Sequence, residues 1–482
     1  MKYAYSFAQV RKADELTIKE GTPSRDLMER AARALADTVK RAMKERGIPD
    51  ALFVCGGGNN GGDGFAAAQF LISEGEEVQV LCLAEKFTPD CLYYKDKFEG
   101  EILGRIPRRR YALIVDCLLG TGITHAPEGD VKALIEFINA SGAYVVACDV
   151  PSGLSENGVA CEPCVVANET LTMGLDKRAL HLCDGVDVCG DISLAQIGIQ
   201  PTQTGAEIWE DFDVKKFYPK KRSNVNKGTF GRACIFGGGT VFCGASFLAA
   251  GACLKSGAGY TRLVVNREVY RGAIGKLPAV ILQEFEAMSG EILASDAIAA
   301  GMGSGVSGRL YAYLVELLEA YTGTLVLDAD ALTTLAAYGV DVLKNKACRV
   351  VITPHPKEFA TLIGKPVHEV LENAVKHAKD FAREYGVVVV LKNNRTIVTD
   401  GERLCINPTG SSALAKGGSG DVLTGFLAGT CARGVAPFEA AVVSSYVLGR
   451  AGELAEEEMG QYAPDAQNII EYLPKAMRAL EQ

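Results

Sequence analysis

The chain has 482 residues and a formal net charge of −9; 48% of its residues are hydrophobic and 23% are charged. A single hydrophobic core rarely grows beyond about 250–300 residues, so this length predicts two domains. The negative charge provides no general attraction for nucleic acid or an anionic membrane surface, and we expect neither partner. Because no apolar run approaches the roughly 20 residues of a membrane span, we expect a cytoplasmic protein without a signal peptide or a spanning helix.

The 15 cysteines lie mostly in apolar, strand-like runs, where free thiols act as small hydrophobic side chains. This use of cysteine indicates a reducing compartment. Cys161 and Cys164 form a CxxC pair, but Cys183 and Cys189 downstream have the wrong spacing for a second pair of zinc ligands. The sequence therefore argues against a zinc site.

The first half alternates apolar runs with stretches long enough for helices. Thr22 and Pro23 are typical of a helix start, and apolar residues recur at helical spacing up to Gly47. Four strand-like runs follow, at residues 51–55, 78–84, 111–117 and 144–150. This rhythm predicts an α/β domain with a Rossmann-like, doubly wound parallel sheet.

A polar stretch between about Ala195 and Asn226 separates this pattern from the next and contains the only tryptophan, Trp209. We place the domain boundary near Asp213, so that residues 1–213 form the first domain and residues 214–482 the second. Strand-like runs then recur at residues 232–239, 261–265, 324–330, 349–355 and 387–392. They predict a second α/β domain.

A glycine-rich loop follows the first strand-like run and could bring backbone amides close to a phosphate at a helix start. Gly56, Gly58 and Gly61 satisfy a loose GxGxxG pattern. Glu85, after the next strand, could bind a ribose, so an NAD-dependent dehydrogenase is one interpretation. Asp63 argues against it, because an anion within the loop would repel a pyrophosphate unless amide donors or a cation intervened.

Two further strand-like runs end in the carboxylates Asp116 and Asp149. The carboxyl ends of parallel strands share one sheet edge, so Asp63, Asn60 and Ser152 are expected to converge with these two side chains. A single Asp after a strand is more often a helix cap or a turn residue. Three such loops on one sheet edge favour a binding site instead.

These loops contain the motifs GNNGGDG, VDCLLGTG and DVPSG, in this order, and with them the first half resembles the N-terminal half of the bifunctional NAD(P)H-hydrate repair enzymes. The resemblance implies an epimerase that interconverts R and S hydrates at the nicotinamide carbon that carries the added hydroxyl. The implied hydrate-binding residues are Asn59, Asn60, Gly61, Gly62, Asp63, Gly120, Thr121, Gly122, Ile123, Thr124, His125, Ala126 and Asp149.

In the same resemblance Asn60, Asp116 and Ser152 match potassium ligands, which suits hard oxygen donors around a monovalent ion. Asp149 is the best candidate for proton transfer at the epimerising centre. Ring opening and direct proton abstraction both stay open as mechanisms.

The second half contains a GGSGD motif that ends at Asp421 and precedes a helix-like run. Free amides at such a helix start would form an anion hole, and Asp421 would be placed to accept a hydroxyl proton during phosphoryl transfer. For an isolated GxGD, a glycine-rich turn capped by Asp is an equally good interpretation. Further motifs lie at residues 226–231, 257–259, 301–305, 328–332, 353–356 and 407–410.

Together these motifs resemble the ribokinase-like dehydratase half of the same repair enzymes. The resemblance implies that ADP or ATP phosphorylates the S hydrate, and that phosphate loss then regenerates NADH or NADPH, with Asp421 as the base. The implied hydrate contacts are Ala258, Gly303, His355 and Asp421. The implied nucleotide contacts are Lys392, Asn393, Asn394, Arg395, Thr396 and Gly420. Beside the nucleotide, K⁺ and Mg²⁺ are the implied cofactors.

The second half departs from the family pattern at three positions. Lys357 stands where the family has the glycine of HPGE, and Asn393 where it has the glycine of LKG. Lys416 replaces a small residue before the GGSGD motif, where it would contact phosphate or face solvent. Because Asp421 and its glycines are intact, we expect an active dehydratase. The departures would alter nucleotide binding.

Three other functions share parts of these patterns. A vitamin or sugar kinase fused to a Rossmann-like domain would release a stable phosphorylated product, a dehydrogenase would need no second half, and a ligand sensor would need no acidic loops. By resemblance, we expect a homo-oligomer whose small-molecule partners are NADH and NADPH hydrates, with ADP favoured over ATP. The basic run 108–110 is interpreted as a solvated loop rather than a contact for the extra phosphate of NADPH.

Overall fold

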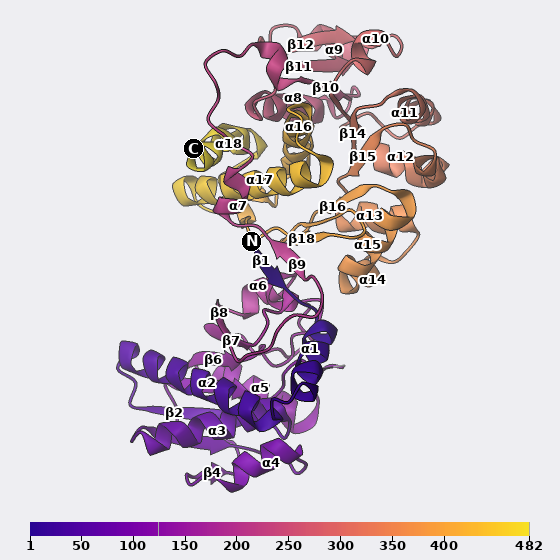
Figure 1. Cartoon of the computed structure of the whole chain (residues 1–482). Helices are drawn as coiled ribbons and strands as arrows, with labels where there is room; N and C mark the ends of the chain where they lie inside the picture. The colour runs from indigo at the N-terminus through magenta and orange to yellow at the C-terminus, as the bar shows by residue number, and fades with distance from the viewer. Residues whose placement is uncertain (124, 482) are drawn as a thin grey trace. The chain divides into compact units, whose positions relative to one another are not determined.

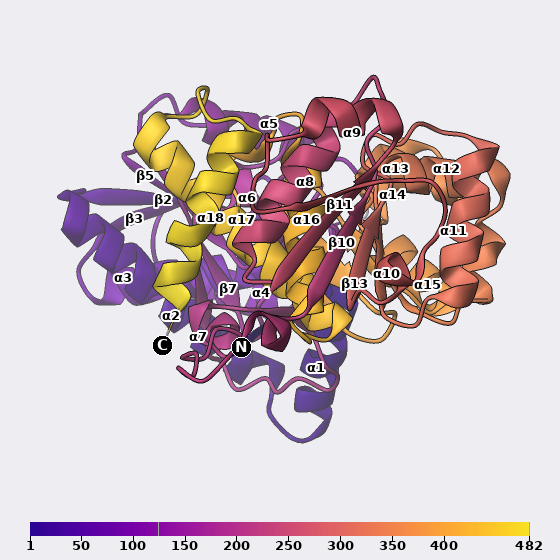
Figure 2. The same ribbon diagram turned by 90° about the horizontal axis from the view of Figure 1, so that it is seen from above.

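The computed structural model describes residues 1–123 and 125–481. The chain divides into two compact units, Tyr3–Ala206 and Glu207–Gln482 together with Met1–Lys2 (Figures 1 and 2). The boundary predicted near Asp213, which separates residues 1–213 from residues 214–482 by activity, stays a prediction. Among the helices that the structure describes, none combines the length and apolar character needed to cross a membrane.

The first unit is built on a seven-stranded sheet in the order β4-β3-β2-β5-β6-β7-β8, in which each pair of neighbours is parallel. Its strands are β2 (Asp50–Cys55), β3 (Glu77–Leu81), β4 (Ile102–Leu103), β5 (Leu113–Cys117), β6 (Tyr144–Cys148), β7 (Glu169–Met173) and β8 (Asp191–Ala195). Its helices are α1 (Phe7–Lys19), α2 (Ser24–Arg46), α3 (Asn59–Ser73), α4 (Pro89–Asp96), α5 (Gly129–Ala140), η1 (Arg178–His181) and α6 (Gly185–Val188).

Alternate residues of β2 are buried on opposite faces of this sheet. Phe53 packs in a core with α2 and α3, whereas Leu52 packs in a core with α5. Helices therefore cover both faces, and the predicted doubly wound fold is confirmed. The predicted helix after Pro23 is α2, which ends at Gly47 in the left-handed conformation. Helix α1 and strands β7 and β8 were not predicted from the sequence.

The second unit contains most of an eleven-stranded sheet in the order β1-β9-β18-β17-β16-β15-β14-β13-β10-β11-β12. Its strands are β1 (Lys2–Ala4), β9 (Ala206–Ile208), β10 (Arg232–Phe236), β11 (Tyr260–Val265), β12 (Ile281–Glu284), β13 (Ala297–Ala300), β14 (Thr324–Leu327), β15 (Arg349–Ile352), β16 (Val388–Leu391), β17 (Ile397–Thr399) and β18 (Leu404–Ile406). All neighbouring strands from β16 through β15, β14, β13, β10 and β11 to β12 are parallel. The pairs β16–β17 and β17–β18 are antiparallel, and this hairpin arrangement was not predicted from the sequence.

The helices of the second unit lie on both sides of its sheet, as Figure 2 shows. They are α7 (Asp211–Lys215), η2 (Lys227–Phe230), α8 (Cys243–Lys255), α9 (Arg267–Ala273), α10 (Gly290–Leu293), α11 (Gly308–Ala320), α12 (Asp330–Tyr338), η3 (Val340–Lys344), α13 (Pro356–Ile363), α14 (Val367–Glu372), α15 (Ala374–Tyr385), η4 (Ser412–Leu414), α16 (Ser419–Ala432), α17 (Pro437–Met459) and α18 (Ala466–Leu480).

Helix α16 is the buried centre of the second unit. Its residues from Val422 to Ala432 are all buried, and they share one apolar core with α8, α17 and α18. Gly425 allows α16 to approach α8 closely, because an added Cβ would clash with the carbonyl oxygen of Ala249. The first turn of α16, which carries Asp421, is therefore held at the end of a rigid element.

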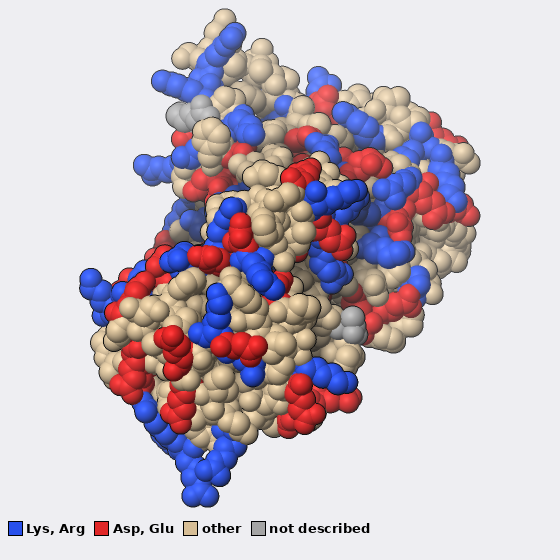
Figure 3. Space-filling model, turned by 60° about the horizontal axis from the view of Figure 1, so that its bottom comes forward, with Lys and Arg blue, Asp and Glu red and all other residues tan. Residues whose placement is uncertain are grey.

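The strand order reverses direction once in each parallel region, between β2 and β5 in the first unit and between β10 and β13 in the second. In open α/β sheets, ligands bind at the carboxyl ends of strands beside such a reversal. On the face that Figure 3 shows, Lys and Arg are interspersed with Asp and Glu.

Candidate active sites

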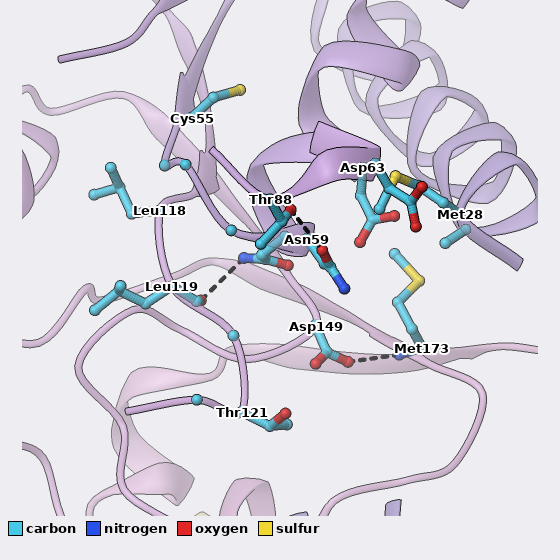
Figure 4. Close-up of a pocket in the computed structure, with 18 of the residues that line it drawn as sticks. Met28, Cys55, Asn59, Asp63, Thr88, Leu118, Leu119, Thr121, Asp149 and Met173 are labelled. Carbon is cyan, nitrogen blue, oxygen red and sulfur yellow. Dashed lines mark hydrogen bonds between the residues drawn. The ribbon is translucent and has the colours of Figure 1, made fainter. Parts of the chain in front are cut away.

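The first unit has a cavity of about 930 Å³ at the carboxyl ends of β2 and β5 (Figure 4). Its lining includes many of the residues predicted to bind the hydrate, which are Asn59, Asn60, Asp63, Gly120, Thr121, Gly122, Ile123 and Asp149. Gly61 and Gly62 are buried within α3. His125 and Ala126 are exposed and are not among the described lining residues. Thr124 lies outside the described residues.

The glycine-rich segment is not a free loop. Gly58 is the N-cap of α3, so Asn59, Asn60 and Asp63 belong to the first two turns of that helix. The prediction that Asp63 lies in the loop is therefore wrong, and its position is set by helix geometry. Gly61 is required here, because an added Cβ would clash with the carbonyl oxygen of Gly56. The N-terminus of α3 faces the cavity and offers amide donors to an anion.

Asn60 and Ser152 both contact the backbone of Leu119, and Ser152 also contacts Asp116. The Ser152 hydroxyl donates to Asp116 Oδ1 at 2.7 Å, and the Ser152 amide donates to Oδ2 at 2.8 Å. Asn60 Nδ2 donates to the Leu119 carbonyl oxygen at 2.9 Å, and the Leu119 amide donates to Ser152 Oγ at 2.9 Å. Burial raises the pKa of Asp116 to about 6, although hydrogen bonds from Ser152 and Leu118 oppose this. A buried carboxylate among hard oxygen donors could hold a cation.

Asp149 follows β6 in a left-handed conformation, with φ of 70°, which is uncommon for a residue other than glycine. Its Oδ1 accepts a hydrogen bond from the Met173 amide at 3.0 Å and from the ammonium group of Lys177. Lys177 also donates to the Met173 carbonyl oxygen at 2.6 Å, and its side chain is only 1% exposed. Lys177 carries no motif in the sequence, and β7, which places this lysine, was not predicted.

The basic run 108–110 is not part of the cavity lining. Arg109 forms ion pairs with Asp50 and Glu77, the first residues of β2 and β3. These are the amino ends of the strands, at the opposite sheet edge from the cavity.

In the second unit, Asp421, Lys392 and Asp328 form a charged cluster at the carboxyl ends of β14 and β16. Lys392 Nζ lies 2.9 Å from Asp328 Oδ1, and the Thr424 hydroxyl donates to Asp328 Oδ2 at 2.7 Å. Gly420 belongs to this cluster, because an added Cβ would lie 3.0 Å from Lys392 Nζ. Of these groups, Asp328 and Thr424 had no role predicted from the sequence.

The charges of this cluster set the proton affinities of its members. Burial, followed by the negative charge of Asp328, raises the pKa of Asp421 to about 7. Burial lowers the pKa of Lys392, but Asp328 and Glu358 outweigh it and the pKa is raised overall. Asp421 can therefore take up a proton near neutral pH, as a general base must.

His355 is the N-cap of α13. Its Nδ1 accepts hydrogen bonds from the amides of Lys357 and Glu358, at 3.1 and 3.2 Å, and Glu358 accepts from the His355 amide at 2.9 Å. Lys357, which replaces a glycine of the family pattern, contributes its amide to this cap and has an exposed side chain. The departure therefore leaves the local fold intact.

The remaining predicted residues of the second unit do not all lie at one edge of its sheet. Residues 392–396 form the turn between β16 and β17, where Arg395 Nη1 donates to the Pro408 carbonyl oxygen at 2.6 Å. Gly303 follows β13 with φ of 63°. Ala258 precedes β11, at the amino edge of the sheet, so the structure does not bring it together with Asp421. Lys416 donates to the Tyr462 carbonyl oxygen.

The two units thus have the character of α/β enzymes, one with a carboxylate–lysine cavity and one with a phosphoryl-transfer type of site. A family model described as NAD(P)H-hydrate dehydratase matches residues 233–475, and one described as YjeF-related protein N-terminus matches residues 24–179. The chain is 32% identical, over 100% of its length and 97% of the relative, to the bifunctional NAD(P)H-hydrate repair enzyme Nnr of Moorella thermoacetica. It is 31% identical to the enzyme of that name from Thermofilum pendens, over 97% and 94% of the two chains.

The second unit also matches a solved structure, the ADP/ATP-dependent NAD(P)H-hydrate dehydratase from Bacillus subtilis co-crystallised with ATP/Mg²⁺. The identity is 27% and the TM-score 0.51, over 57% of this chain and 99% of that one. The chain belongs to the family of bifunctional NAD(P)H-hydrate repair enzymes, and its second unit has the ribokinase-like fold expected from the sequence.

Proposed function

We propose that residues 1–213 interconvert the R and S hydrates of NADH and NADPH, and that residues 214–482 dehydrate the S hydrate with ADP or ATP. The observation that carries this proposal is that each unit places one acid–base carboxylate beside a helix N-terminus. Asp149 faces the N-terminus of α3 across one cavity, and Asp421 lies in the first turn of α16. Amide donors at these helix starts would hold the anionic parts of the substrates.

In the second unit, Asp421 would accept the hydroxyl proton of the S hydrate while the hydroxyl oxygen attacks the terminal phosphorus of the nucleotide. The bond from that phosphorus to its bridging oxygen breaks as the new bond forms. Phosphate then leaves with the electrons of its bond to the ring carbon, and loss of a proton from the neighbouring carbon restores the double bond. Lys392 lies beside Asp421 and would balance negative charge during transfer.

The proposed metal ions differ in how they would be held. K⁺ would be held by Asn60, Asp116 and Ser152, which place buried oxygens together. The Asp116 carboxylate is among them, and burial raises its pKa. The ion would supply positive charge that stabilises this carboxylate and the neighbouring loop. Mg²⁺ would be held mainly by the nucleotide phosphates at the start of α16. Among the described residues, no three His, Cys, Asp or Glu side chains cluster as a metal site.

We expect the enzyme to act in the cytoplasm, on small molecules, as a homo-oligomer. The cysteines that the structure describes are all free thiols, most of them buried, which supports a reducing compartment.

The decisive experiment measures recovery of reduced-nicotinamide absorbance from a mixture of R and S NADH hydrates, with and without ADP or ATP. Full recovery that requires a nucleotide is the expected result for the wild-type enzyme. The Asp149→Ala variant should rapidly recover only the S share. Absence of recovery with either nucleotide would contradict the proposal and favour a kinase that releases its phosphorylated product.

A further inference from the structure

The ion pair between Asp149 and Lys177 fixes the orientation of one carboxylate in the first-unit cavity. Lys177 and the Met173 amide both donate to Asp149 Oδ1, whereas Oδ2 lies on the side of Gly120 in the cavity wall. A buried ammonium needs an anionic partner, and Asp149 provides one. Asp149 therefore presents a free carboxylate oxygen to a bound ligand.

A second carboxylate faces the same space in a different state (Figure 4). Asp63 points into the cavity from α3, and no hydrogen bond or ion pair joins its carboxyl group to another residue that the structure describes. Burial, followed by the negative charges of Asp149 and Asp14, raises the pKa of Asp63 well above its ordinary value. The titratable groups around Asp63 are Asp14, Asp149, Lys177, Cys91, Tyr94 and Cys148.

Epimerisation of a hydrate needs two such groups. The hydroxyl-bearing carbon is bonded to the ring nitrogen, and its hydrogen is not acidic, so direct proton abstraction there is unfavourable. Ring opening avoids this: a base removes the hydroxyl proton, the carbon–nitrogen bond breaks, and its electron pair moves to the nitrogen. An acid then protonates that nitrogen, leaving an aldehyde and an enamine. Rotation about the neighbouring carbon–carbon bond and the reverse steps give the other epimer without any oxidant or reductant.

We propose that Asp149 is the base and Asp63 the acid of this ring opening, and that Lys177 is the positioning residue that holds Asp149 in place. This inference rests on the proposed epimerase function of the first unit and assigns its mechanism. Pairs of carboxyl groups whose surroundings separate their proton affinities are typical of acid–base catalysis. Asp63, without a partner on α3, and Asp149, paired with Lys177 after β6, are two such carboxyl groups in different surroundings within one cavity.

The test follows conversion of purified R hydrate of NADH to the S form by chromatography, without ADP or ATP and against an enzyme-free blank. Asp63→Asn preserves size and neutral charge but removes the transferable proton, so kcat should fall about a hundredfold or more, with KM within about twofold. Lys177→Met should lower kcat to a similar degree and change the pH profile of kcat, since Asp149 loses the cation that holds it. Lys177→Arg should restore part of the lost kcat and part of the wild-type pH profile.

The matched control is Lys346→Met, which removes a partly buried lysine that donates to the carbonyl oxygens of Leu343 and Tyr385 in the second unit. Its epimerisation rate should equal that of the wild-type enzyme. The circular dichroism spectrum and the thermal unfolding curve report folding of each variant. A kcat unchanged by Asp63→Asn would overturn the inference, even if Lys177→Met proved unstable. Failure of the wild-type enzyme itself to interconvert the hydrates would instead refute the proposed epimerase function.

Discussion

The pH dependence of the dehydratase provides a direct test of the second site. Asp421 lies between Asp328, which disfavours its ionised form, and Lys392, which favours it, and burial brings its pKa to about 7. Only the ionised carboxylate can accept the hydroxyl proton. The value of kcat/KM for S hydrate should therefore fall about tenfold for each pH unit below 7 and level off above it.

The Asp421→Asn substitution removes this base without changing the size of the side chain. General-base catalysis contributes about a hundredfold to ten-thousandfold, so the substitution should lower kcat/KM by that range and abolish its rise with pH. The assay is nucleotide-dependent recovery of reduced-nicotinamide absorbance from purified S hydrate. Epimerisation of R hydrate, measured on the same protein without nucleotide, serves as the control and should not change.

A different outcome would refute the reasoning. If kcat/KM of the wild-type enzyme were constant between about pH 5 and 8, Asp421 would not be a base with the expected proton affinity. If the Asn variant retained the wild-type slope, another group would carry the titration.

Three further predictions concern the cation, the buried ion pair and helix packing. Replacing K⁺ by tetramethylammonium should slow epimerisation, and Asp116→Asn should make the rate insensitive to this exchange, as initial rates would show. Lys392→Met leaves Asp328 buried without its cation and should lower the free energy of unfolding by about 3–5 kcal/mol in urea titrations; addition of Asp328→Asn should recover part of the loss. Gly425→Ala should destabilise the fold by about 1–3 kcal/mol through its clash with α8, whereas Gly272→Ala, where a Cβ meets no neighbour within 4 Å, should not. Equal melting temperatures of the two glycine variants would contradict the packing argument.

Local signals in the sequence were sufficient to predict much of this protein. Apolar runs of strand length that alternate with helical spacing predicted two α/β units, the first with a parallel sheet, because burial on both sheet faces leaves that pattern in the chain. Carboxylates at the ends of strand-like runs predicted that Asp116 and Asp149 share a sheet edge with Asn60, since parallel strands end on the same side. The glycines before Asp421 likewise predicted a helix start, which the structure confirms as α16.

The partners of these groups were decided only by the tertiary structure. Lys177 reaches Asp149 across 28 positions of sequence, and Thr424 reaches Asp328 across 96. Neither contact leaves a local pattern, because the pairing depends on which strands become neighbours. His355 caps a helix, and Ala258 lies at the opposite sheet edge from Asp421, although both stand in motif-like segments. The sequence by itself determined which residues stand at strand ends and helix starts, while the packing of distant elements decided which of them are buried, charged and within reach of one another.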